Sequence, residues 1–206
     1  VPPGGSATTR RTGTMGAMKG MGQVYVEELA QIVDLAPAPG VRIDWERVEN
    51  KLGRRLPSDY KAFAERFGSG HFDEYIWVAV PRGFGSRLDF FGQLEQSVET
   101  LRSLAADGIP VPYPLYPEKG GLISWGSTID GEVLYWRTDD DDPDRWSVVL
   151  HLHKTDDWFE FRGSVTDFLC ALLTGQTAVP VLPDGFGLQQ HAFIRFGPTQ
   201  DSGVPD

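Results

Sequence analysis

The sequence has a single cysteine, Cys170, among its 206 residues. One thiol excludes an intramolecular disulfide framework and a zinc site built from several cysteine ligands. Apolar runs are also short, and none approaches the roughly 20 consecutive apolar residues that a transmembrane helix needs. These absences predict a protein of the reducing cytosol that does not insert into membranes.

Basic residues are scarce relative to acidic ones. The chain has 19 Lys and Arg against 29 Asp and Glu, a formal charge of −10. Residues 1–22 hold three basic residues and no acidic one, so the remainder has 16 basic and 29 acidic residues, a net −13. Because phosphate would be repelled, we expect no nucleic-acid partner. The charge is typical of a highly soluble protein, or of one that captures a basic partner quickly.

The two ends of the chain differ from its middle. Residues 1–22 are rich in Gly, Ser, Thr and Met without periodicity, and residues 197–206 are mostly Gly, Pro and polar. We predict two disordered tails, because so little apolar area cannot offset the entropy of ordering. Residues 23–196 are predicted to form a single domain. Its C-terminal extension past Gly175 is expected to add a short edge strand over residues 191–196.

Apolar side chains at helical spacing predict five helices. They cover about residues 26–36, 45–52, 58–67, 94–106 and 165–173. Asp44 is a favourable N-cap, and Gly53 and Gly68 are favourable stop signals. Ser164 and Asp167 form a capping box at the start of the last helix.

Strand signals fill most of the second half of the chain. They cover about residues 75–80, 122–125, 132–137, 146–153 and 158–161. Asp130-Gly131 is a strong signal for a hairpin between the second and third of these. Helices followed by a meander of strands and a closing helix predict an α+β fold, with an antiparallel-rich mixed sheet packed by helices.

Two segments carry a recognisable pattern. The first runs Asp44-Trp-Glu-Arg-Val-Glu-Asn-Lys-Leu-Gly53, then Arg54-Arg-Leu-Pro-Ser-Asp-Tyr60 and the helix closing at Gly68 to Gly70. The second holds the Asp130-Gly131 hairpin, the Trp146 strand and the helix from Ser164. Over roughly residues 41–175 the chain resembles the SUKH superfamily of Smi/Knr-type immunity and regulatory proteins. The acidic segment after Arg137 and the extension past Gly175 depart from the usual pattern.

The resemblance implies a SUKH-like fold and a protein that binds another protein without catalysis and without a cofactor. Many bacterial members resemble immunity proteins that neutralise secreted toxins, so a cognate toxin is the expected partner, and a basic nuclease would suit the charge. The alternative is a regulatory scaffold or adaptor of the same fold that contacts a cellular enzyme. A hydrolase is the third hypothesis, because a catalytic site can be assembled from residues distant in sequence.

The acidic run Asp139-Asp140-Asp141-Asp142-Pro143-Asp144 is the first candidate for partner binding. It is expected in a loop between two strands. It lacks the ligand spacing, central Gly and distal Glu of an EF-hand, so we expect no metal site. The run is interpreted either as a solvated loop without a role or as an electrostatic contact for a basic partner.

Three tryptophans near this run, Trp136, Trp146 and Trp158, are the second candidates. Tryptophan is enriched among residues that dominate binding energy when it is partly exposed. The alternative is that all three simply cover the sheet. His151 and His153, two apart on one strand, are expected on one face, as ordinary histidines without a metal. The sequence has no recognised nucleophile or phosphate-binding motif.

Overall fold

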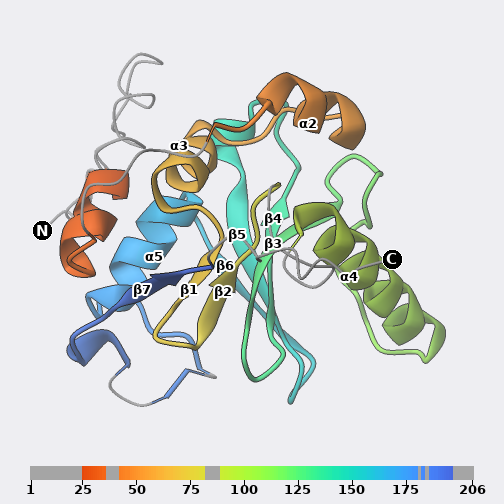
Figure 1. The fold of residues 1–206 in the computed structure, drawn as a ribbon. Helices are drawn as coiled ribbons and strands as arrows, with labels where there is room; N and C mark the ends of the chain where they lie inside the picture. The colour runs from red at the N-terminus through yellow and green to blue at the C-terminus, as the bar shows by residue number, and fades with distance from the viewer. Residues whose placement is uncertain (1–24, 36–41, 82–88, 181, 184–185, 197–206) are drawn as a thin grey trace, which may run out of the picture.

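The fold is an antiparallel sheet with helices packed around it, as Figure 1 shows. The computed structural model describes residues 25–35, 42–81, 89–180, 182–183 and 186–196. The α+β prediction is confirmed. Both predicted tails, 1–22 and 197–206, lie outside the described residues, so their disorder stays a prediction, as do the domain boundaries.

Seven strands form one sheet in the order β6-β5-β4-β3-β2-β1-β7. The strands are β1 (Gly70–Phe72), β2 (Ile76–Val78), β3 (Leu122–Thr128), β4 (Val133–Arg137), β5 (Ser147–Leu152), β6 (Asp157–Phe161) and β7 (Phe193–Arg195). Every pairing between these strands is antiparallel, so the sheet is antiparallel throughout and not mixed as predicted. The physical reason is connectivity, because six consecutive strands follow one another as a meander.

A helical segment over residues 25–32 precedes α2 (Trp45–Leu52), α3 (Ser58–Phe67), α4 (Phe90–Ala106) and α5 (Val165–Leu173). Side-chain caps mark where three of these helices, α2, α4 and α5, begin. The Asp44 side chain caps α2, and Gly53 ends it with φ of 70°. Helix α4 begins four residues before its prediction, because the Asp89 side chain accepts a hydrogen bond from the Gly92 N–H at 3.1 Å.

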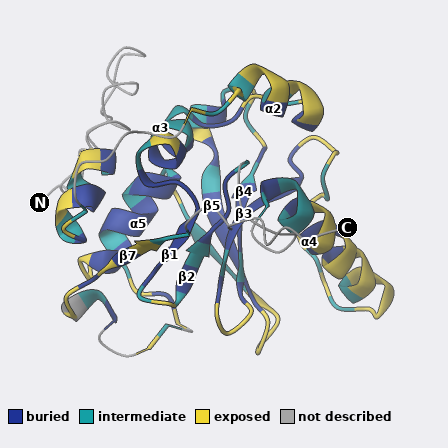
Figure 2. Ribbon diagram, in the orientation of Figure 1, coloured by how far each residue is buried: buried dark blue, intermediate teal, exposed yellow. Residues whose placement is uncertain are grey.

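One face of the sheet carries the main core. Val148, Leu150 and Leu152 of β5 all lie in it, as their alternation predicts, together with the buried sides of α3 and α5. Figure 2 shows these two helices buried where they meet the sheet, while the outer side of α2 is exposed. On the opposite face, α4 crosses β3 and adds a smaller cluster around Leu101 and Tyr135.

At one edge of the sheet, β1 pairs with β7, and the sequence predicted only one of these two strands. Edge strand β7 falls within the predicted range, but β1 was not predicted. Gly70 is required there, since a Cβ atom would lie 2.3 Å from the backbone oxygen of Ile194. Phe193 packs its ring against Phe67 and Phe72 at centroid distances of 5.0 and 4.8 Å, so the C-terminal extension completes the core.

Candidate protein-binding surface

The acidic loop, residues 139–144, joins β4 to β5 and has a defined conformation. Its aspartates accept hydrogen bonds from its own backbone: Asp140 from the Asp142 N–H at 2.9 Å, and Asp142 from the Asp144 N–H at 3.2 Å. Asp side chains favour such turns for this reason. A short 3₁₀ helix, η1 (Pro143–Arg145), follows. The conformation of the loop is therefore held by hydrogen bonds to its own carboxylates.

Contacts with the body of the domain hold the loop in place. The Asp144 carboxylate accepts a hydrogen bond from the Ser58 N–H at the start of α3. The Trp146 indole donates to the backbone oxygen of Asp140 at 2.7 Å. Pro143 of the loop is itself buried. These contacts anchor the loop to the body of the domain.

Cations of the same chain offset much of the loop's charge. Arg137 lies 3.1 Å from Asp139, Arg145 lies 3.2 Å from Asp140, and Lys119 lies 3.0 Å from Asp141. Five aspartates face three cations, a formal excess of two negative charges. Asp141 keeps 92% of its side chain exposed, so its pair with Lys119 is weak in water. The loop is less acidic than its sequence indicates, but its outer carboxylates remain accessible.

The tryptophans beside the loop belong to the interior. Trp136 is 1% exposed and Trp146 is 5% exposed, so neither ring is available as a surface contact, and the prediction of exposed anchors is wrong for these two. Trp136 packs edge-on against Tyr60 at 4.7 Å, because both fill the space between sheet and α3. Trp158 on edge strand β6 is only partly buried, against Tyr113 and His151. It remains a candidate for contact.

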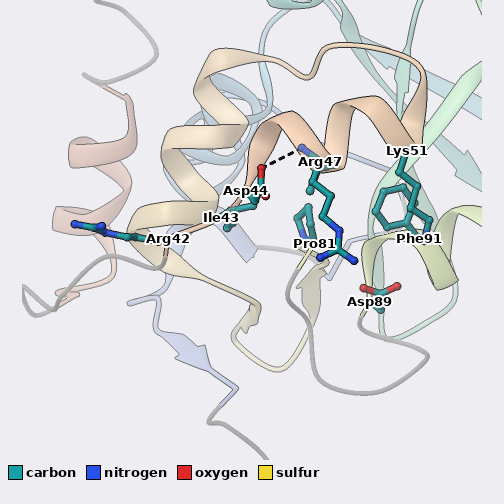
Figure 3. Close-up of a pocket in the computed structure, with 9 residues that line it drawn as sticks. Arg42, Ile43, Asp44, Arg47, Lys51, Pro81, Asp89 and Phe91 are labelled. Atoms are coloured by element: carbon teal, nitrogen blue, oxygen red, sulfur yellow. Dashed lines mark hydrogen bonds between the residues drawn. The ribbon is translucent and has the colours of Figure 1, made fainter.

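Sequence reasoning missed a basic hollow beside α2. A cavity of about 670 Å³ is lined by Arg42, Ile43, Asp44, Arg47, Val48, Lys51, Pro81, Asp89 and Phe91. In Figure 3, Arg47 extends from α2 into this hollow and Lys51 lies over the ring of Phe91. The signal was present in the sequence: five of the 19 basic residues fall within residues 42–55 of an acidic chain.

Two further hollows border the acidic loop, and one of them also contacts the basic residues at the end of α2. One of about 530 Å³ is lined by Lys51, Arg54 and Arg55 on one side and by Asp140 and Asp141 on the other. Another, of about 590 Å³, lies across the loop and includes Asp139, Asp144 and Glu160. The acidic loop therefore stands between two open depressions.

The remaining sequence candidates have structural partners. His151 is buried 3.4 Å from Asp156, whereas His153 is exposed and lies 3.0 Å from the buried Glu132. Burial lowers the pKa of His151, and Asp156 opposes that shift. Within the described ranges, no three His, Cys, Asp or Glu side chains are grouped as a metal site would need. Gly83-Phe-Gly85 lies outside the described residues.

Comparison with known proteins gives one match. The family model described as SMI1 / KNR4 family (SUKH-1) matches residues 42–171, which contain α2 through most of α5. No curated protein and no solved structure matches the chain. In the part of the chain that the structure describes, none of the helices combines the length and apolarity that crossing a membrane requires. The matched segment spans more than half of the sequence, and the chain therefore belongs to the SMI1/KNR4 family (SUKH-1).

Proposed function

We propose that this chain is a non-enzymatic binding protein of the immunity type, which neutralises a bacterial toxin domain by covering its active site. Membership of the family is compatible with immunity or regulatory roles. The observation that carries the proposal is the acidic loop, which hydrogen bonds anchor to the domain and whose outer carboxylates face solvent beside two depressions. A preformed loop loses little conformational entropy on binding, and its charge favours a basic partner such as a nuclease.

Four carboxylates of the domain serve the fold as hydrogen-bond acceptors. Asp44 and Asp89 each cap a helix, and Asp144 caps the start of α3 through the Ser58 N–H. Asp59 accepts from Thr166 at the start of α5. A carboxylate that already satisfies backbone donors is a structural acceptor, and general acid–base chemistry needs a group free to exchange its proton.

The test is co-expression in bacteria with a toxin domain, taken first from any toxin gene that lies beside this one. We expect cells that produce the chain to survive the toxin, and the purified proteins to form a complex. Survival should fall when residues 139–142 are neutralised. A chain that neither protects cells nor binds the toxin would contradict the proposal. If it instead bound and regulated a cellular enzyme, the adaptor hypothesis would replace it.

A further inference from the structure

The sheet has two edge strands, and β6 is the longer of them. It pairs with β5 over Asp157–Phe161, five residues, whereas β7 at the opposite edge has three. The pairing of β6 with β5 is regular, without a bulge, and the strand has no proline. Bulges and prolines are common devices that keep a sheet edge from pairing with another chain. Their absence leaves β6 able to accept a further strand.

The outward-facing backbone groups of β6 belong to alternate residues. The Thr128 N–H donates to the Glu132 backbone oxygen at the β3–β4 turn, and this bond sets the alternation of bonded and non-bonded pairs from β4 to β6. The N–H and C=O of Phe159 then face β5, and those of Trp158 and Glu160 face away from the sheet. Among the described residues, no segment outside β6 offers these groups a hydrogen bond. An extended backbone satisfies such a row of donors and acceptors.

A second copy of the chain fits this edge when the register is centred on Phe159. A two-fold axis perpendicular to the sheet pairs β6 with β6 antiparallel and keeps the same faces together. All residues of both strands are then paired. Phe159 lies opposite its own copy, and Trp158 lies opposite Glu160 of the second copy. Asp157 lies opposite Phe161, so no like charges oppose each other.

The residues just beyond the ends of β6 carry complementary charges in this register. Asp156 precedes the strand and Arg162 follows it, so each lies opposite the other residue of the second copy. Arg162 is exposed and forms no ion pair among the described residues. Asp156 lies 3.4 Å from His151 but keeps 42% of its side chain exposed. The dimer would therefore have an Asp–Arg pair at both ends of the shared strands.

Neighbouring registers bring like charges together. Centring on Glu160 places two carboxylates opposite each other, and centring on Trp158 places Asp156 opposite Glu160. Like charges directly opposite destabilise a strand pair. Glu160 is bound within its own copy, by the Ser147 hydroxyl at 3.0 Å and by Arg137 at 3.4 Å. The charges therefore favour the register centred on the residue between Trp158 and Glu160.

We infer that β6 pairs with β6 of a second copy, antiparallel and centred on Phe159, so that one sheet continues through both copies. Trp158 then contacts another copy of this chain. Dimerisation goes beyond the proposed function and does not depend on it, because no toxin takes part. Since the shared strands are short, we expect a dissociation constant on the order of micromolar.

The first test exchanges the charges at the strand ends. Sedimentation of the full chain between about 1 and 500 μM measures the monomer–dimer equilibrium. Arg162→Glu and Asp156→Lys each place like charges opposite each other twice per dimer, and each should weaken dimerisation by about tenfold or more. Mixing the two variants restores both attractive pairs, so the mixture should dimerise about as tightly as the parent. The inference is overturned by a monomeric parent, by single variants that dimerise normally, or by a mixture that stays monomeric.

The matched controls are Arg102→Glu and Asp107→Lys, the same charge reversals at exposed positions of α4 and its C-terminal cap. We expect them to leave the dissociation constant unchanged, and the melting temperatures of all variants to stay near that of the parent. If the controls weaken the dimer as much as Arg162→Glu and Asp156→Lys do, only net charge matters, and the inference is overturned.

Amide hydrogen exchange measured by NMR tests the strand pairing itself. The Trp158 and Glu160 N–H groups should exchange rapidly in the dilute monomer and slowly in the dimer, whereas the Phe159 N–H should be protected in both. A dimer without protection of the two outward amides would use another surface. Protection in the monomer would assign the edge to the chain's own residues 1–22 or 197–206, and protection only with a bound toxin would assign it to a toxin strand. Each of these results overturns the inference.

Discussion

The carboxylate of Asp59 accepts hydrogen bonds from both the backbone N–H and the hydroxyl of Thr166, at 2.9 and 3.0 Å, across 107 residues of chain. Asp59 lies in the first turn of α3 and is 4% exposed. Thr166 lies in the first turn of α5, where backbone N–H groups have no partner within the helix. The next residue, Tyr60, donates its hydroxyl to the Ala79 oxygen at 2.6 Å. The Asp-Tyr pair of the family-like motif therefore joins α3 to α5 and to the sheet.

Asp59 should make stability depend on pH. Burial raises the pKa of Asp59, and the hydrogen bonds from Thr166 oppose that shift only in part. The folded state then binds more protons than the unfolded state above the ordinary Asp pKa of about 4, so the free energy of unfolding falls as pH rises through the raised pKa. Asp59→Asn removes this dependence, and its stability relative to the parent should increase with pH.

Urea denaturation between about pH 3 and pH 7 measures this difference. The pKa of the nearby Asp167 is also raised, first by burial and then by the charges of Asp59 and Glu28, so it contributes in the same direction. Asp107→Asn, at an exposed position, is the control. If the free energy of unfolding changed with pH equally in the parent and in Asp59→Asn, the pKa of Asp59 would be the same in the folded and unfolded states, and the prediction would be wrong.

Leu173→Ala should destabilise the domain by about 2–5 kcal/mol, because it leaves a cavity under α5. Leu173 is 2% exposed and lies in the main core. The same substitution at the half-buried Leu104 of α4 is the comparison and should cost less. Chemical denaturation gives both values. Equal losses would mean that α5 does not pack as described.

Replacing Asp139, Asp140, Asp141 and Asp142 with Asn should change stability little but slow association with a basic toxin. Asn can accept the same turn hydrogen bonds, and exposed ion pairs contribute only about 0–1 kcal/mol each. Lys119 and Arg145 then lose their acidic partners in the loop and Arg137 keeps only Glu160, so three cations face the two remaining carboxylates, Asp144 and Glu160, and the local charge should become positive. Association rates from stopped-flow should then fall and lose much of their salt dependence.

A variant with four charges removed elsewhere separates the loop from net charge. Exposed acids suited to this control are Glu27, Glu74, Glu95 and Asp107. It should associate nearly as fast as the parent. If both variants associate at the parental rate at low and high salt, the acidic loop is only a turn.

Truncation should separate the predicted tail from the edge strand. Removal of residues 197–206, with or without residues 1–22, should leave the melting temperature nearly unchanged. Removal of everything after Gln190 should lower it by many degrees, because it deletes Phe193 from the core and the Arg195 bonds to the Phe67 and Arg66 oxygens. Thermal unfolding of both truncations is the measurement, and similar losses in the two would contradict the role of β7.

Cys170 should be unreactive in the folded protein. It is 5% exposed, and burial together with the charges of Glu28 and Asp167 raises the pKa of its thiol to about 12. The thiolate is the reactive species, so alkylation at pH 8 should be very slow until the protein is unfolded in denaturant. Mass spectrometry of the native and the unfolded protein measures the extent of Cys170 alkylation. Rapid alkylation of the native protein would show that α5 opens readily.

Much of the secondary structure followed from signals within a few residues. Asp44 caps the start of α2 and Gly53 ends it, while Ser164 caps the start of α5. Asp130-Gly131 forms the turn between the paired strands β3 and β4. These features were predictable because caps and tight turns depend on neighbouring side chains and allowed backbone angles. The acidic run was correctly placed between two strands for the same reason.

The exposure of the tryptophans and the ion pairs of the acidic loop could not be predicted from local signals, since they depend on residues distant in sequence. Trp136 and Trp158 are both sheet tryptophans, yet only the first meets Tyr60 across the core. The acidic loop is offset by Lys119, a partner 22 residues away from Asp141. The sequence by itself determined the α+β class, the family and most element boundaries. The tertiary structure alone decided which tryptophans are buried and which cations pair with the acidic loop, because only packing brings such distant side chains within contact distance.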